Sequence, residues 1–134
     1  MNTVANPPKH LARTSRYAHA LTGVAILHVA ALLFQAVTAG LLLSSPGGRS
    51  LHMTSGIALV VIGLVHVVLA VLAWRPGGGS GRYIAPAALL LVMTVVAAAL
   101  GAAGIDSVHV PLGVLLFGGG VIQVFRLRSS PRAA

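Results

Sequence analysis

The stretch LHMTSGIALVVIGLVHVVLAVLAW, residues 51–74, is almost entirely apolar and yet contains two histidines, His52 and His66. It carries no charged residue, and about 20 apolar residues suffice to cross the hydrocarbon core of a bilayer. The stretch therefore predicts a membrane-spanning helix. Because an ionisable side chain inside such a helix is costly and usually faces a partner, these two imidazoles are the first candidates for a functional site.

The composition of the whole chain agrees with a membrane protein. Of the 134 residues, 57% are hydrophobic and only 7% are charged, whereas soluble domains carry about 25% charged residues. The chain has no cysteine, which excludes disulfides, thiolate ligands and iron–sulfur clusters. Asp106 is the only acid, which excludes catalysis by paired carboxylates. Histidine is therefore the main reactive side chain that the sequence offers.

Three further apolar runs accompany the first. The pattern predicts helices over about 17–43, 51–74, 83–103 and 108–125, joined by short segments rich in turn-forming residues. The predicted fold is an all-α membrane protein, an up-and-down bundle of four transmembrane helices over residues 17–126. A flexible basic tail at 1–16 and a basic tail at 127–134 flank this domain.

The basic residues predict the orientation of the bundle. The net charge is +8, and eight of the nine basic residues fall on one side of the four-helix layout; Arg49 is the exception. By the positive-inside rule this side is cytoplasmic, so both termini are expected there. The charge is thus a topology signal with membrane lipid as the partner, and no nucleic-acid partner is expected.

The second and fourth predicted helices repeat one another. HMTSGIALVVIGLVHVV, from His52, aligns with HVPLGVLLFGGGVIQVF, from His109. The alignment pairs Gly56 with Gly113, Gly63 with Gly120, and His66 with Gln123, and Gly40 and Gly101 both close the preceding helix. The chain is therefore expected to consist of two helical hairpins in parallel repeat.

His52 and His109 open two helices that run in the same direction, so they are expected at the same depth. The second and fourth helices of such a bundle are diagonal partners, and both histidines can point at its axis. Glycines follow each histidine by four and eleven residues on nearly the same face: Gly56, Gly63, Gly113 and Gly120. A porphyrin needs an axial nitrogen from each side and missing side chains where the ring lies, so the pattern predicts haem between His52 and His109. Two other interpretations remain open. The glycines could serve only to allow close helix packing, with the histidines at the membrane interface. The histidines could instead bind zinc, although a third and a fourth ligand are hard to find.

His66 lies about 21 Å further along the second helix than His52, towards the cytoplasmic half. His28 on the first helix is expected at about the same depth, and Gln35 lies two turns from His28 on the same face. The sequence thus leaves open a second bis-histidine haem site, His28 with His66. The two haem sites together would form a path for electron transfer across the membrane. Against it, the two helices are neighbours in the bundle, and the repeat places Gln123 where a second histidine would be expected. The alternative is a buried His66 hydrogen-bonded to Gln123, His28 or a carbonyl group.

The full pattern, Gln35 to Ala39-Gly40, Leu51-His52 to Gly56 and His109-Val110-Pro111-Leu112-Gly113, resembles one four-helix half of haem A synthase. It is also similar to small uncharacterised bacterial four-helix membrane proteins that would bind haem b. The resemblance covers about residues 30–125. It implies that His52 and His109 are axial haem ligands. Gln35 is expected, with the glycines, among the residues that bind the cofactor, and the chain is expected in the bacterial inner membrane. Haem A synthase has eight helices and an acid in its first outer loop, which the segment SSPGGRS lacks, so the synthase activity is not carried over.

The sequence therefore predicts a membrane b-type cytochrome with one haem b, or two, that transfers single electrons rather than a stand-alone enzyme. Its redox partner is expected in the membrane, as quinone or another redox subunit, in a homo- or hetero-oligomer. Two rival functions remain. The chain could be an accessory subunit without a cofactor of its own, or a proton or metal transporter lined by His28, Gln35, His66 and Gln123.

Overall fold

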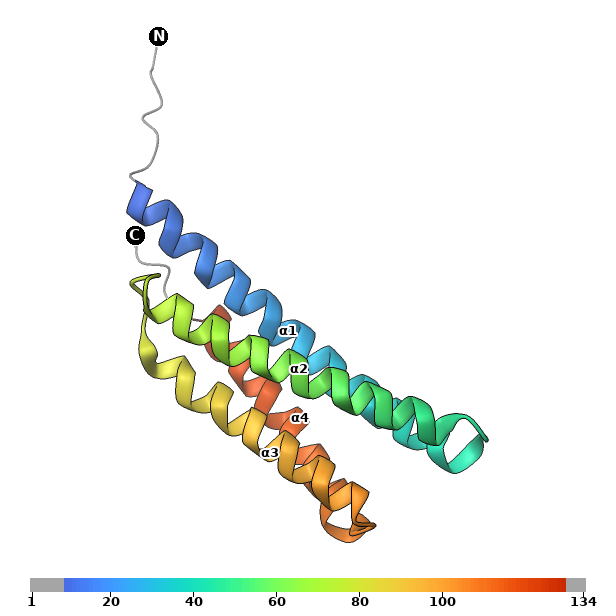
Figure 1. The fold of residues 1–134 in the computed structure, drawn as a ribbon. Helices are drawn as coiled ribbons and strands as arrows, with labels where there is room; N and C mark the ends of the chain where they lie inside the picture. Colours follow the sequence, from blue (N-terminus) through green and yellow to red (C-terminus); the bar gives the residue numbers. More distant parts are fainter. Residues whose placement is uncertain (1–8, 130–134) are drawn as a thin grey trace.

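The structure is a computed structural model; it describes the backbone of residues 9–129 and the side chains from Arg16 onwards. The described chain folds into four α-helices, shown in Figure 1. Each of them is long and apolar enough to cross a membrane. Their bounds are α1 Lys9–Ser44, α2 Gly48–Trp74, α3 Ile84–Ala102 and α4 Asp106–Arg128, with a short 3₁₀ helix η1, Gly81–Tyr83, before α3.

The helices run alternately up and down, as the sequence predicts (Figure 1). α1 and α3 each pack against both α2 and α4, so that α2 and α4 are diagonal partners. The segments 45–47 and 103–105 lie together at one end of the bundle, which we call the distal end. The start of α1, the segment 75–80 and the end of α4 lie at the other, the terminal end.

The helix bounds differ from the prediction mainly at the start of α1. The prediction began this helix at residue 17 after a loose tail, but the helix begins at Lys9. The apolar run that the prediction relied on begins near residue 17, whereas the helical backbone extends back through good helix formers such as Leu11 and Ala12. The other predicted bounds are wrong by at most three residues. The rest of the predicted tails, 1–8 and 130–134, lie outside the described residues.

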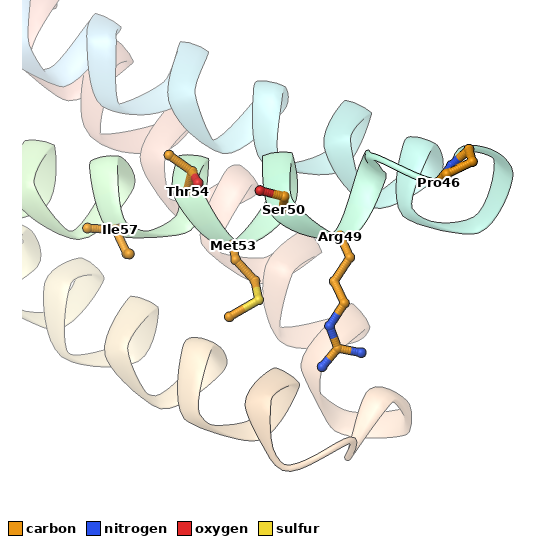
Figure 2. A pocket seen from close by; sticks show the side chains of 6 residues that line it. All are labelled: Pro46, Arg49, Ser50, Met53, Thr54 and Ile57. Carbon is orange, nitrogen blue, oxygen red and sulfur yellow. The ribbon is translucent and has the colours of Figure 1, made fainter.

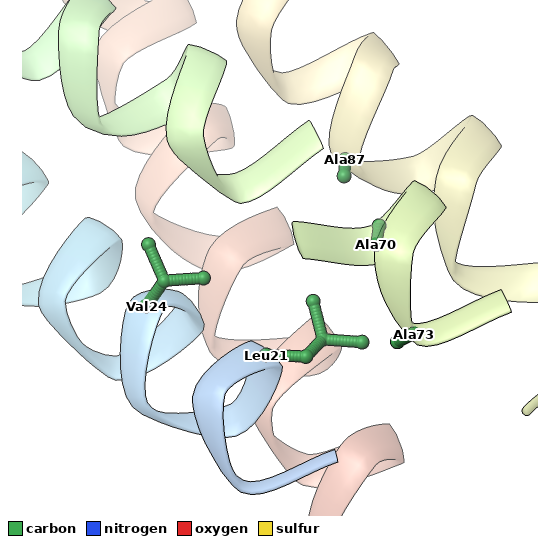
Figure 3. Packing of buried hydrophobic residues seen from close by; sticks show 5 residues of the cluster. All are labelled: Leu21, Val24, Ala70, Ala73 and Ala87. Atoms are coloured by element: carbon green, nitrogen blue, oxygen red, sulfur yellow. The ribbon is translucent and has the colours of Figure 1, made fainter. Parts of the chain in front are cut away.

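Two clusters of buried apolar side chains form the interior of the described bundle, one rich in leucine and one rich in alanine. Near the terminal end, Leu21 and Val24 of α1 meet Ala70 and Ala73 of α2 and Ala87 of α3, as Figure 3 shows. Large apolar side chains instead cover the outside; Leu27, Ile57, Leu89, Leu115 and Phe125 are examples. Small residues inside allow close helix approach, and an apolar outside matches lipid tails, so this packing is typical of a membrane bundle.

Glycine sets the geometry of both turns at the distal end. Gly104 has a φ of +71° and follows α3, with Gly104 N–H donating to Gly101 O and Ile105 N–H to Leu100 O. This is the Schellman arrangement, in which a residue without a Cβ takes the left-handed conformation that ends a helix. Between α1 and α2, Gly48 is buried, and a Cβ there would overlap the backbone of Leu41. These two turns determine how the first residues of α2 and α4 face the rest of the bundle.

Candidate functional site

The structure brings His52 and His109 together at the distal end of the bundle. Their ring centroids are 6.1 Å apart and the ring planes meet at 84°. His52 is the fifth residue of α2 and His109 the fourth of α4, so both imidazoles extend from the first turns of parallel, diagonal helices. Both side chains are half-buried. We call this pair the distal pair.

α3 holds the His109 ring in place. Nδ1 of His109 lies 2.7 Å from the backbone carbonyl oxygen of Ala97. A carbonyl can only accept, so Nδ1 carries the proton and donates it, and the lone pair of the neutral ring is on Nε2. The ring also lies against Gly101, where a Cβ would be 3.0 Å from its Cε1 and Nδ1 atoms. The turn at Gly104 folds α4 back so that this contact with α3 forms.

α1 holds the His52 ring through a network of side chains. The Thr38 hydroxyl, which is fully buried, lies 3.0 Å from Nδ1 of His52. Thr38 has one proton, and it can donate to the backbone carbonyl of Gln35 at 3.0 Å or to its side-chain Oε1 at 3.2 Å. Its lone pairs then accept from Nδ1–H of His52, which leaves Nε2 of this ring free as well.

Gln35 and Ser55 complete this network. The Ser55 hydroxyl donates to Oε1 of Gln35, and Nε2 of Gln35 donates to the backbone carbonyl of His52 at 3.2 Å. Gln35 also occupies the space beside Gly56, where a Cβ would be 3.0 Å from its Nε2. Gln35 was predicted to share a face of α1 with His28 and also to bind the cofactor together with His52 and His109; the structure connects it to His52.

The distal pair therefore has the hydrogen-bonding pattern of metal-ligating histidines. Such a histidine usually donates one ring N–H to a carbonyl or another acceptor, which orients the ring and leaves the second nitrogen for the metal. In the described part of the chain, both rings make their hydrogen bonds through Nδ1, and no hydrogen bond occupies Nε2. Within the same part, no group of three histidine or acidic side chains forms the kind of cluster that zinc requires.

The other two membrane histidines, His28 and His66, meet in the interior of the bundle and form the inner pair. Their Nδ1 atoms are 3.1 Å apart, their ring centroids 5.4 Å apart, and each side chain is 1% exposed. One Nδ1 donates to the other, so one ring retains a free Nε2 lone pair and the other a free Nε2–H. Both Nε2 atoms are buried without a partner among the described residues.

Gln123 of α4 is a further buried polar residue of the bundle interior. Its side chain is 3% exposed, and both its amide nitrogen and its amide oxygen are buried without a hydrogen-bond partner in the described chain. The repeat pairs it with His66, and both residues are indeed buried on parallel helices. However, the hydrogen bond of His66 goes to His28, which was one of the alternatives that the sequence left open.

The four glycines that were predicted to leave room for a porphyrin ring have different surroundings. A Cβ on Gly63 would contact Leu91 at 3.1 Å and the His28 ring at 3.4 Å, and one on Gly120 would contact Val29 at 3.0 Å. At these positions the glycine provides room for a neighbouring side chain, which is the packing role that the sequence left open. Only Gly113 has open space within 4 Å of where its Cβ would be.

Sequence reasoning missed four contributors to the distal site: Thr38, Ser55, Gly101 and the carbonyl group of Ala97. Thr38 and Ser55 had a usable signal, because they are hydroxyl residues within apolar runs and such groups must find partners in a membrane. The Ala97 carbonyl had none, since every residue has one and only the packing of α4 on α3 selects it.

For the haem that the sequence predicts between His52 and His109, we expect Thr38→Val to lower the affinity by about tenfold, because loss of a partner that orients a ligating histidine typically has this effect. The substitution keeps the shape of the side chain and removes only the hydroxyl. Titration of the apoprotein with haemin, followed by absorbance, measures the affinity. Thr22→Val is the matched control, since the Thr22 hydroxyl is exposed and bonds only to Ala18 of its own helix.

Gly101→Ala tests the contact between α3 and His109. The added methyl group pushes the ring by a few tenths of an ångström and weakens its hydrogen bond to Ala97, at a cost of about 1 kcal/mol. Thermal unfolding of the solubilised protein, followed by circular dichroism, measures this loss. Gly118→Ala on α4 is the control, because a Cβ there meets nothing within 4 Å. Equal melting temperatures for the two variants would contradict the assigned contact.

No protein-family model, curated protein or solved structure matches the chain in any of the three comparisons. The function must therefore be argued from the site itself.

Proposed function

We propose that this chain is a membrane b-type cytochrome whose haem b is held by His52 and His109. The observation that carries the proposal is the geometry of the distal pair. Two imidazoles that bind one metal ion from opposite faces, each at a metal–nitrogen distance of about 2.0 Å, have ring centres roughly 6 Å apart. The separation of 6.1 Å and the two free Nε2 atoms agree with this requirement.

Each residue of the site has a distinct part in this proposal. His52 and His109 would hold the haem iron through Nε2, while Thr38 and the Ala97 carbonyl hold their Nδ1–H groups. Gly113 offers open space beside the pair. The remaining predicted haem-binding residues already have neighbours. Gln35 bonds to Ser55, and side chains of α1 or α3 lie against three glycines, Gly56, Gly63 and Gly120. These residues would line the haem only if the neighbouring side chains moved aside. When bound, haem b supplies reversible one-electron chemistry, and two histidine ligands leave no open position for a substrate.

The proposed setting is the inner membrane of a bacterium, with both termini and most of the arginines on the cytoplasmic side. Basic residues at the terminal end support this orientation; Arg16, Arg75, Arg82, Arg126 and Arg128 are among them. The distal pair then lies near the opposite face. An apolar outer surface with short connecting segments suits a redox partner within the membrane, either quinone or another redox subunit of an oligomer.

The resemblance to one half of haem A synthase remains part of this proposal. It supports His52 and His109 as ligands and does not extend to the synthase reaction. The accessory-subunit and transporter functions stay as rival proposals. The transporter is favoured by one specific observation, the unpartnered polar atoms of His28, His66 and Gln123 in the bundle interior.

An absorption spectrum of the purified full-length chain from haem-replete cells tests the proposal. A cytochrome gives a Soret band and split α and β bands on reduction, and a pyridine haemochrome assay gives the haem content per chain. Complete absence of these bands, also after addition of haemin to the solubilised protein, would refute the proposed function and favour one of the two rivals.

The inner pair raises the question of a second haem. His28 and His66 fit the residue types of such a site, and their unpartnered Nε2 atoms support it. Their direct Nδ1 contact at 3.1 Å means that the two rings would have to separate and turn to accept a porphyrin. The distal rings do not touch each other through their ring nitrogens and are already 6.1 Å apart, so we propose one haem there as the primary site and the inner pair as a second candidate site.

The haem content of His66→Ala decides between one haem and two. If only the distal pair binds haem, we expect an unchanged ratio of haem to protein in this variant. If the inner pair also binds haem, the ratio falls from two to one. His19→Ala is the control, because His19 lies near the start of the apolar part of α1, outside both pairs.

A further inference from the structure

Arg49 is the single basic residue at the distal end of the bundle, whereas the other eight basic residues belong to the terminal end or the tails. It is the second residue of α2 and lies three positions before His52, which places it one turn closer to the distal surface. In Figure 2 its side chain extends from α2 towards the segment that joins α3 to α4. The guanidinium therefore lies on the side of α2 that faces the start of α4.

Arg49 also lines an open groove of about 510 Å³ together with Pro46, Ser50, Met53, Thr54 and Ile57 (Figure 2). The groove combines one cation and two hydroxyl groups near the distal surface with apolar side chains deeper along α2. This is the chemistry that an apolar ligand with an anionic edge requires.

The guanidinium makes no hydrogen bond or ion pair with the described residues. Asp106, the only acid of the chain, begins α4 at the same end of the bundle but forms no ion pair with Arg49. Arginine presents a planar fork of donors that matches a carboxylate, and it remains charged at any ordinary pH. The distal end thus holds an arginine that pairs with no described residue, three positions before His52 on α2.

Haem b has two carboxylates, and carboxylates do not lie unpaired in hydrocarbon. His52 and His109 belong to the first turns of their helices, about 6 Å of helix rise from the distal surface. A ring held between them can direct its carboxylates to that surface, and the terminal end is too far away to receive them. We propose that Arg49 binds the haem carboxylates and so determines the orientation of the haem in its site, with the carboxylates towards the distal surface. This inference rests on the proposed function.

The test compares haemin with its dimethyl ester, in which both carboxylates are masked. Solubilised full-length wild type, Arg49→Gln and Arg49→Lys are loaded with each compound, and its transfer to excess apomyoglobin is followed by absorbance. We expect wild type to release the ester about tenfold faster than haemin, because one charge-assisted pair contributes on the order of 1.4 kcal/mol. Arg49→Gln should release both compounds at the same rate, and Arg49→Lys should be intermediate. Arg75→Gln, at the terminal end, is the matched control and should behave as wild type.

A second readout is the midpoint potential, which we expect to fall in Arg49→Gln loaded with haemin, since removal of a cation stabilises the oxidised iron. Two results would overturn the role of Arg49 and leave the proposed function intact. One is a rate of haemin release from Arg49→Gln equal to the wild-type rate, and the other is a difference between the release rates of haemin and its ester that persists in this variant. A wild-type chain that forms no low-spin complex with either compound would overturn both.

Discussion

We expect His109→Ala and His52→Ala each to abolish low-spin haem binding. This is the largest effect that we expect of any substitution in the chain. Loss of a hydrogen bond that supports a metal ligand already weakens metal binding by roughly 10–100-fold, and loss of the ligand itself must cost more. We therefore expect at least about a 100-fold drop in haemin affinity for either variant. A spectral titration with haemin, read at the Soret band, measures this change.

The hydrogen-bonding pattern also predicts how these variants can be rescued. We expect free imidazole to fill the space left by His109→Ala and to restore a low-spin spectrum, because the Ala97 carbonyl remains available to orient it. His10→Ala serves as the control, since His10 precedes the first apolar run. A low-spin spectrum of full intensity in His52→Ala or His109→Ala without imidazole would show that the ligands are wrongly assigned.

Gly48→Ala is expected to be the most damaging substitution for the fold. Gly48 is buried, and its Cβ would overlap the carbonyl group of Leu41, which belongs to the backbone and cannot turn aside as a side chain can. The turn between α1 and α2 must therefore open. We expect a loss of about 2–3 kcal/mol in the free energy of unfolding, typical of overpacking at a rigid site. Unfolding of the solubilised protein in increasing denaturant, followed by circular dichroism, measures it.

The neighbouring residue is a matched control for this prediction. A Cβ on Gly47 meets nothing within 4 Å, so Gly47→Ala changes the same turn without the overlap. Its stability should stay within about 0.5 kcal/mol of wild type, as for most surface substitutions. Similar stabilities of the two variants would mean that the close approach of Gly48 to α1 does not hold the turn. Because this turn sets Thr38 opposite His52, we also expect Gly48→Ala to weaken haemin binding.

The sequence could predict the helices because their signal is local. Runs of about 20 apolar residues separated by turn formers predict both the number of helices and their alternating direction. The pairing of His52 with His109 also followed from local reasoning. Two parallel helices that begin with histidine place both side chains at one level, and the repeat supplied the register.

The extra helical turns at the start of α1 were missed because helical backbone does not need an apolar environment. Residues 9–16 are polar and basic, and the hydropathy that marks a spanning segment is absent there. The helix nevertheless continues, since its backbone hydrogen bonds are made within the helix in water as well as in lipid. Hydropathy thus detected the part of α1 suited to the hydrocarbon core and not the whole helix.

The partners of the four membrane histidines were decided only by the tertiary structure. The sequence left His66 with three alternatives, and the rotation of α1 against α2 selected His28. It placed Gln35 both on the helical face of His28 and among the haem-binding residues with His52, and the close approach of α1 and α2 at the distal end brings Gln35 against His52. A helical wheel states which side chains share a face, but it cannot state which neighbouring helix that face meets or at what distance.

The sequence by itself determined a histidine-bearing bundle of four apolar helices, because burying backbone polar groups in lipid leaves the helix as the local solution for each segment. The packing of α1 and α3 around the two diagonal helices decided which nitrogen of each distal histidine is free. That choice depends on one hydroxyl and one backbone carbonyl brought within 3.0 Å of the rings by glycine-dependent turns. Hydrogen bonds act over such short distances that only the assembled bundle specifies them.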